Sequence, residues 1–385
     1  MRFSESFDEV LRPFCSDRFA SHVLQKLISV CAHRGNYVKI DNEDVVEIKH
    51  SEAQKYNEIA LKLCKYVINN IEEFIWDTYA NHVLRTAIEC LGGIIDLSSN
   101  NNKKKMGPNL EIRRKVENEY KVLLISTCKR LLKLPQLAEF NHDDLTSGFV
   151  QSILYSLKDI DSDLNSALIS RIITECFTKS DIDNLSNVFN NECSIRLLEV
   201  CLAVSDPKVF TNIFETYFEN KLGQLSLMKG ANFCVQRLFE HCPTKEELEK
   251  YFDEISIHFE SILKVGHTGI LASLAKACCR LHVRQGPFVN SMCKILHCDE
   301  SNERQIQIVP LVVSLKTYEE YESLKSNVEA KITTNLHGSL IVQAILHFNK
   351  PIKAVNSILG MKSQELSELF SDPKGSRVMD AFMES

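Results

Sequence analysis

The sequence has few of the residues that make tight turns, and it has no long apolar run. Only 13 of its 385 residues are glycine and 9 are proline, too few for a turn-rich β fold. No stretch approaches the roughly 18 apolar residues of a membrane-spanning helix, and the start, MRFSESFDEV, lacks a basic region followed by an apolar run. We therefore expect an intracellular protein without membrane association.

The motifs of common catalytic and metal sites are also missing. The fourteen cysteines are scattered and no two form C-x-x-C, so they do not supply the closely spaced ligands of a zinc site. The chain contains no phosphate-binding loop, no H-E-x-x-H, no G-x-S-x-G and no glycine-rich dinucleotide motif. We expect buried thiols in a reducing compartment, no metal, no cofactor and no catalytic residue, and hence a protein that is not an enzyme.

Charge is unevenly distributed along the chain. The net charge is −6 and the pI is about 6.1, which on its own argues against a nucleic-acid partner, because such partners are bound mainly through their phosphates. Between Asn101 and Leu134, however, the sequence has ten Lys and Arg but only three Glu, so this segment carries +7 and the remainder −13. A local basic patch therefore remains available for RNA.

One amphipathic pattern recurs along the chain. In FASHVLQKLI, residues 19–28, the main apolar positions fall within about 140° of a helical wheel, and Ser21, His22 and Gln25 occupy the adjoining sector. Similar stretches read YANHVLRTAI, GANFCVQRLF, HGSLIVQAIL and KGSRVMDAFM. Each stretch predicts a helix with one face for a core and a narrower polar face beside it.

The spacing of these copies predicts a repeat protein. Positions equivalent to Ser21 fall at Asn81, approximately Gly148, Ile195, Asn232, approximately Gly269, Ser339 and Ser376. The steps are 60 and 67 residues at first and then mostly 37, and a degenerate copy near Gln305 would divide the one step of 70. A period of about 36 is typical of a helical solenoid, so we expect an all-α array with two or three helices per repeat.

Two polar insertions account for the longer steps in the first half. They lie at about residues 35–55 and 97–115, and both read as loops that project from the repeats. We expect residues 1–385 to form a single array that is incomplete at both ends, because solenoids need terminal repeats with a polar outer face.

The recurring motif resembles the Pumilio-type RNA-binding repeat. The match is good in FASHVLQ, YANHVLR, GANFCVQ, HGSLIVQ and KGSRVMD, and poor in CSIRLLE, SGFVQSI and HTGILAS. In order along the chain, DRFASHVLQKL, DTYANHVLRT followed by LGG, ANFCVQRLFEHC, LASLAKACCRLHVRQGPF, HGSLIVQAILHFNK and DPKGSRVMDAFMES resemble the nucleolar protein 9 family. This ordered set covers almost the whole chain.

The resemblance implies a right-handed, C-shaped α-solenoid of about eleven Pumilio-like repeats in the nucleolus or nucleus. Such a protein binds small-subunit pre-rRNA on its concave face and restrains premature cleavage by the PIN-domain endonuclease. It implies further contacts with pre-ribosomal assembly factors, and we expect a monomer.

The same resemblance supplies the candidate site residues. In such repeats two side chains one turn apart hydrogen-bond a base edge, and the residue after the first stacks between bases. Carried onto this chain, the RNA-binding residues are Ser21, His22, Gln25, Asn81, His82, Arg85, Asn232, Phe233, Gln236, Ser339, Gln343, Ser376 and Arg377.

Alternatives to base contact remain open at these positions. For Ser21 and Gln25 the alternative is a solvated helix flank; for Arg85 and Arg377 it is a salt bridge, and for Phe233 partial burial. His22 and His82 lack a neighbouring carboxylate or thiol cluster, which favours stacking or exposure over catalysis.

Several copies depart from the family's motif. Asn81 is followed by Arg85 where the family has glutamine, Ser376 is followed by Asp380, and Ile195 replaces a polar residue. A readout of one base by each repeat is therefore not expected throughout.

Two other functions fit parts of the pattern. The acidic total charge and the repeats without polar pairs favour a protein-binding scaffold of the HEAT or armadillo kind. A Pumilio-type regulator of mRNA is the third possibility, and it would require nearly uniform repeats of 36 residues with intact polar pairs.

Overall fold

The described part of the chain is helical. The computed structural model describes residues 10–36, 50–94, 113–177, 185–326 and 332–385. Within these ranges there is no strand, only an isolated antiparallel bridge between Ile94 and Arg113. None of the helices in this described portion is long and apolar enough to cross a membrane. The prediction of an all-α protein is confirmed.

The chain divides into two compact units, residues Met1–Val209 and Phe210–Ser385, and each is described by itself. The helices of the first unit are α2 (Leu11–Ser16), α3 (Ala20–Gly35), α4 (His50–Asn69), α5 (Ile71–Phe74), α6 (Ala80–Leu91), α7 (Asn118–Leu131), η2 (Pro135–Glu139), α8 (Asp144–Leu157), α9 (Ser162–Glu175), η3 (Asn187–Asn190) and α10 (Glu192–Val204).

The second unit, together with the helix that leads into it, contains α11 (Pro207–Tyr217), α12 (Leu222–Leu227), α13 (Asn232–His241), α14 (Lys245–Ile255), η4 (Ser256–His258), α15 (Phe259–Val265), α16 (Gly269–Leu281), α17 (Gln285–Ile295), α18 (Asn302–Gln305), α19 (Ile308–Ser314), α20 (Tyr318–Ser326), α21 (Leu336–Leu346), α22 (Ile352–Gly360), α23 (Ser363–Ser371) and α24 (Ser376–Glu384).

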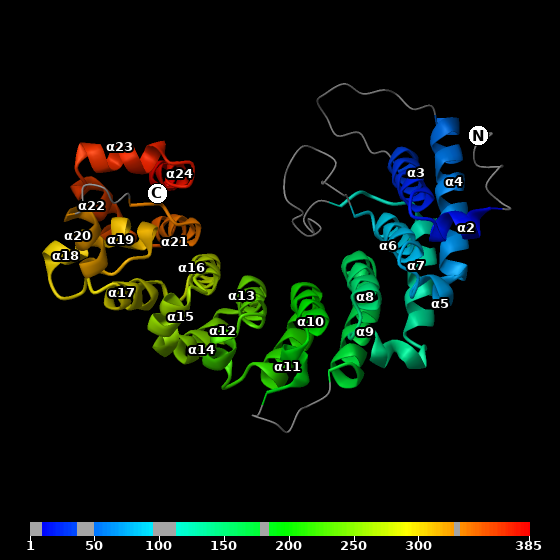
Figure 1. The fold of residues 1–385 in the computed structure, drawn as a ribbon, viewed down its shortest axis with the longest axis horizontal. Coiled ribbons are helices and arrows are strands. Elements are labelled where there is room, and N and C mark those ends of the chain that lie inside the picture. Colours follow the sequence, from blue (N-terminus) through cyan, green and yellow to red (C-terminus); the bar gives the residue numbers. More distant parts are fainter. Residues whose placement is uncertain (1–9, 37–49, 95–112, 178–184, 327–331) are drawn as a thin grey trace. The chain divides into compact units, whose positions relative to one another are not determined.

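In each unit one helix from every repeat packs against its counterpart in the next repeat. In the first unit these are α3, α6, α8 and α10, and in the second α13, α16, α21 and α24 (Figure 1). We call these eight the row helices. Their apolar residues fill the core: Leu24, Leu84 and Ile153 are at most 2% exposed. Burying each such side chain contributes roughly 1.5–3 kcal/mol, so stacking rather than local propensity holds the repeats.

Aspartate or asparagine starts most of the row helices. Asp17 accepts hydrogen bonds from the backbone N–H groups of Phe19 (2.9 Å) and Ala20 (2.7 Å), which lowers the pKa of its carboxyl group. Asp77, Asp143, Asn191, Asn335 and Asp372 accept from backbone N–H groups at the starts of α6, α8, α10, α21 and α24. The side chain satisfies N–H groups that the helix itself leaves unpaired, so it fixes where the helix begins.

The predicted thiols are buried. All fourteen cysteines are free, and all except Cys193 and Cys279 are buried. Burial raises the pKa of Cys90 to about 12, which keeps its thiol protonated and unreactive. Among the described residues no cluster of three or more His, Cys, Asp or Glu could hold a metal ion.

Two predictions about the longer steps need correction. Helix α4 begins at His50, inside the first predicted insertion, because its amphipathic sequence packs against α3. The degenerate copy near Gln305 contributes no row helix; α16 packs directly on α21, while α19 packs against α21 and α22. Residues 37–49 and 95–112, most of the two insertions, lie outside the described residues, and a single array over 1–385 stays a prediction.

Candidate nucleic-acid interface

Each row helix presents three positions of interest. The first is equivalent to Ser21, the second is the next residue, and the third lies one turn after the first. Side chains at the first position are buried in every row helix except α24, where Ser376 is half-buried: Ser21 is 1% exposed, Asn81 0%, Asn232 3% and Ser339 1%. This position therefore belongs to the packed interior of the row, and a ligand would meet mainly the second and third positions.

In three row helices the third-position glutamine is held by the first-position residue. Its Nε2 donates to an oxygen one turn earlier, in the pairs Gln151 to Ser147 (3.1 Å), Gln236 to Asn232 (3.0 Å) and Gln343 to Ser339 (2.9 Å). Because an amide carries a second N–H and a carbonyl oxygen, each glutamine keeps a donor and an acceptor for a planar ligand edge. These pairs are pre-organised hydrogen-bonding groups on α8, α13 and α21.

The first-position side chain also connects neighbouring row helices. Its partner is the residue two before the first position of the next helix, in the pairs Asn81 Nδ2 to Leu145 O (3.2 Å), Ser147 Oγ to Cys193 O (3.1 Å), Ser339 Oγ to Lys374 O (2.7 Å) and Thr268 Oγ1 with His337 Nδ1 (2.8 Å). Ser147 and Ser339 therefore each join two repeats and also orient the glutamine one turn later.

This pattern corrects the register of two repeats. The first position of α8 is Ser147 rather than Gly148, and that of α16 is Thr268 rather than Gly269. Gln151 thereby becomes a site residue that sequence reasoning missed. The signal was present: Asp143 caps α8 four residues before Ser147, as Asp17 caps α3 four residues before Ser21.

Other predicted pairs are arranged differently. Gln25 Nε2 lies 3.4 Å from His22 Nδ1 instead of bonding Ser21. Arg85 Nε donates to Ser152 Oγ of the next row helix at 3.3 Å. On α24, Arg377 pairs with Asp380 at 3.3 Å, and both side chains are mostly exposed. Arg85 thus bonds the neighbouring repeat through a hydroxyl, and Arg377 forms a weak exposed ion pair within its own helix.

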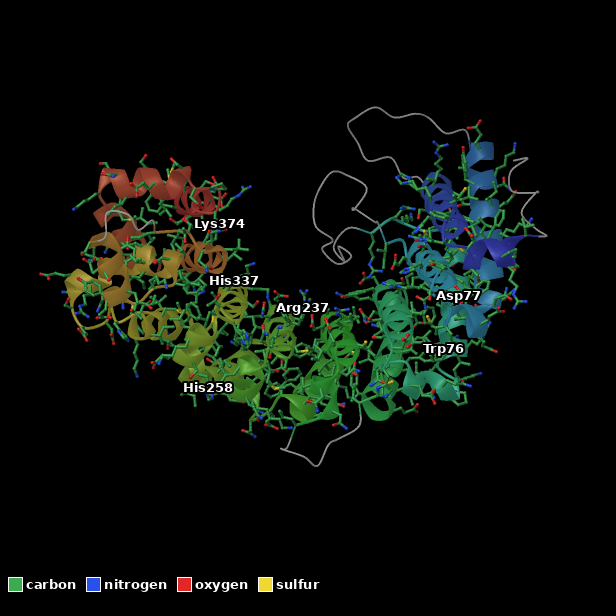
Figure 2. All side chains as sticks on the ribbon, viewed as in Figure 1. Trp76, Asp77, Arg237, His258, His337 and Lys374 are labelled. Carbon is green, nitrogen blue, oxygen red and sulfur yellow. The ribbon has the colours of Figure 1, made fainter. Side chains whose placement is uncertain are left out.

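Second-position side chains are the accessible part of the motif. Phe233 is 54% exposed, and His22, His82 and Arg377 are exposed as well. In the second unit, Arg237, His337 and Lys374 lie along one side, on or beside α13, α21 and α24, whereas His258 lies on the opposite side (Figure 2). A row of flat and basic side chains therefore accompanies the glutamines.

The basic segment between Asn101 and Leu134 contributes less to a patch than its charge suggests. The Arg113 side chain is only 13% exposed; it forms an ion pair with Asp159 at 2.8 Å and donates to Ser156 O at 3.2 Å. Burial lowers the pKa of Arg113, against the effect of Asp159. Lys103 to Lys105 lie outside the described residues.

Comparison with known proteins places this geometry in context. A family model described as the NOP9-like PUF repeat domain matches residues 1–385. Nucleolar protein 9 of Homo sapiens is 27% identical over 402 aligned residues, which cover 97% of this chain and 63% of that protein. Pumilio homolog 23 of Arabidopsis thaliana is 25% identical, over 100% of this chain and 53% of that protein. The chain thus spans between half and two thirds of these relatives.

Solved structures share the fold. The structure of APUM23 with its insert region deleted and with GGAAUUGACGG superposes with a TM-score of 0.74 at 23% identity, covering 100% of this chain and 69% of that chain. APUM23 with GGAAUUGACGG gives a TM-score of 0.73, also at 23% identity, covering 100% of this chain and 71% of that chain. The prediction of Pumilio-like helical repeats is confirmed.

Proposed function

Because the chain belongs to the family with the NOP9-like PUF repeat domain, we propose that it binds RNA along its row helices. The observation that carries this proposal is the set of glutamine pairs at Ser147, Asn232 and Ser339, each fixed within 3.1 Å. A pre-organised amide loses little conformational entropy when it binds a base edge, and exposed side chains such as Phe233 offer faces for stacking.

We further propose that the RNA is small-subunit pre-rRNA and that the protein acts in the nucleolus during ribosome biogenesis. The human relative carries the name Nucleolar protein 9, which supports this location and process. In this role the chain, as a monomer, restrains premature processing, contacts pre-ribosomal assembly factors and carries out no catalytic step of its own.

Fluorescence anisotropy with labelled GGAAUUGACGG and with single-stranded pre-rRNA fragments tests RNA binding directly. We expect binding at low salt that weakens as salt rises, with a slope of about −0.7 per neutralised phosphate in a log–log plot. Undetectable binding at low salt, or an affinity independent of salt, would overturn the proposal.

A pair of variants tests where the RNA lies. We expect Asn232→Ala combined with Gln236→Ala to weaken binding more than neutralisation of Lys103 to Lys105. The double variant removes a fixed hydrogen-bonding pair, whereas neutralising the three lysines changes only net charge. The reverse order would mean that the insertion, rather than the row helices, holds the RNA.

The restraint on processing needs its own assay. Cleavage of a pre-rRNA fragment by the purified PIN-domain endonuclease is measured with and without the protein. We expect slower cleavage with the wild type and a smaller effect with the Asn232 and Gln236 double variant. Equal cleavage rates with and without bound protein would remove this part of the proposal while leaving RNA binding in place.

The structure offers less support for regulation of mRNA. In the second unit the first positions are Asn232, Thr268, Ser339 and Ser376, so the steps are uneven, and α16 has the buried Ala272 at its third position. Uniform repeats with intact pairs, which that role requires, are therefore lacking among the described row helices.

One observation favours a protein-binding role. Helix α22 exposes Ile352 (62%) and Leu359 (69%), two apolar side chains about two turns apart on the same face. Failure of RNA binding in the anisotropy series would favour a scaffold of the HEAT or armadillo kind.

A further inference from the structure

Two row helices have glycine at the second position, and in both the preceding row helix fills the space above it. A Cβ on Gly148 would lie 2.8 Å from Arg85 Nη1 and 3.1 Å from Arg85 Cζ. A Cβ on Gly269 would lie 2.6 Å from Gln236 Oε1. The absence of a side chain therefore lets a long third-position group from one repeat lie on the backbone of the next.

The Arg85 guanidinium is held in this place by a short hydrogen-bond chain. Arg85 Nε donates to Ser152 Oγ at 3.3 Å, and Ser152 Oγ donates to Glu89 Oε1 at 2.8 Å. Ser152 is 3% exposed, so the hydroxyl is a fixed acceptor on α8. The guanidinium is thus held against α8 by Ser152, whose hydroxyl is itself oriented by Glu89 of α6.

Asn81 does not act together with Arg85. Its side chain is 0% exposed, and its Nδ2 donates to Ile75 O at 2.8 Å and to Leu145 O at 3.2 Å. These bonds connect α6 to its neighbours within the unit. The sequence pattern predicted that Asn81 and Arg85 would together hydrogen-bond the edge of one base. In the structure Asn81 is used within the protein, and Arg85 lies against α8 of the next repeat.

A guanidinium in this place has a defined chemical use. It is planar, weakly hydrated and always charged, and it stacks on aromatic faces, including the faces of nucleobases. The α8 repeat has the Ser147–Gln151 pair for a base edge but has only Gly148 where its own stacking side chain would stand. A flat group supplied by α6 completes that repeat.

We propose that Arg85 is the stacking platform for the base bound at α8, in the place that Gly148 leaves open. This inference rests on the proposed RNA binding and goes beyond it by assigning one side chain to the face of one base. Gln236 lies on Gly269 in the same way, but its Nε2 is bonded to Asn232 and α16 has no third-position amide. The platform is therefore specific to the first unit.

The test uses GGAAUUGACGG and eleven derivatives that each carry one abasic site, with the full chain and an Arg85→Lys variant. Lysine keeps the charge but lacks the plane, so we expect affinity for the intact RNA to fall about tenfold with an unchanged salt slope. The abasic site opposite the platform should weaken binding to the wild type but not to the variant. Each of the other abasic sites should lower the affinity of the wild type and of the variant by the same factor.

A second variant acts on the platform without changing the arginine. Gly148→Ala would push the guanidinium aside, and we expect it to remove the penalty of the same abasic site. The matched controls are Arg12→Lys, on an exposed ion pair with Glu73, and Gly286→Ala, where an added Cβ meets open space. Both controls should bind as the wild type does, and thermal midpoints confirm that all variants are folded.

The outcomes separate the two proposals. Wild-type protein that binds none of the RNAs overturns RNA binding and the platform together. Wild-type binding with an Arg85→Lys variant of equal affinity overturns the platform alone. A uniform loss across all twelve RNAs also overturns it, because a phosphate contact or a purely structural role would not depend on which base is missing.

Discussion

Replacing Ser339 with alanine tests whether the first-position residues hold the repeats together. Ser339 Oγ donates to Lys374 O at 2.7 Å and accepts from Gln343 Nε2 at 2.9 Å, and the side chain is 1% exposed. The substitution removes both hydrogen bonds and leaves a carbonyl of the neighbouring repeat without this partner. Its effect on unfolding therefore reports the strength of the connection between α21 and α24.

The expected magnitude follows from these two bonds. Each contributes about 1 kcal/mol net, and an unsatisfied buried group costs about 1–3 kcal/mol. Alanine favours the helix over serine by about 0.5 kcal/mol, which offsets part of the loss. We expect Ser339→Ala to lower the free energy of unfolding by about 1–2.5 kcal/mol, a fall of roughly 2–10 °C in the thermal midpoint of the second unit.

Urea and thermal unfolding of the full chain, followed by circular dichroism, measure this change. Exposed Ser367, in the middle of α23, provides the control: Ser367→Ala gains helix propensity without removing a buried bond, so it should match or slightly exceed the wild type. If Ser339→Ala is as stable as Ser367→Ala, the hydroxyl does not join the repeats and the structural role of the first position is wrong.

Two further predictions follow from helix starts and from titration. Asp77→Ala should lower the free energy of unfolding by about 1 kcal/mol, because the carboxylate accepts from the N–H groups of Tyr79 (2.8 Å) and Ala80 (2.7 Å) at the start of α6; Asp77→Asn should recover most of the loss in the same denaturant assay. Burial lowers the pKa of His337 below its usual 6.5, so the unfolded chain takes up a proton that the folded chain resists. The stability from neutral His337 is complete above pH 6.5 and is lost as pH falls from there toward the folded pKa. Between about pH 7.5 and 5.5 the thermal midpoint should therefore drop more for the wild type than for His337→Gln, and parallel curves would contradict this.

Much of the local structure could be predicted from the residues themselves. The apolar spacing of FASHVLQKLI and its copies predicted the row helices, and the scarcity of glycine and proline predicted an all-α fold. The polar pairs Asn232–Gln236 and Ser339–Gln343 were recognised because residues four apart share a helix face. Ser147 was missed by one residue, although Asp143 marked the helix start that would have fixed the register.

Contacts between repeats could not be predicted in this way. The period indicated a degenerate copy between α16 and α21, but these helices pack directly on each other, and Thr268 meets His337 at a separation of 69 residues. Periodicity gives the number and length of segments. It does not decide which helix reaches the row, because that depends on how the intervening helices pack.

The sequence by itself determined which segments are helical, where most of them start, and which polar residues stand beside each apolar face. These properties depend on residues within one or two turns of each other. Only the tertiary structure decided that the first-position side chains are buried between repeats and that Arg85 lies over Gly148 of the next helix. Both depend on groups 35 or more residues apart, and such groups meet only after the helices have stacked.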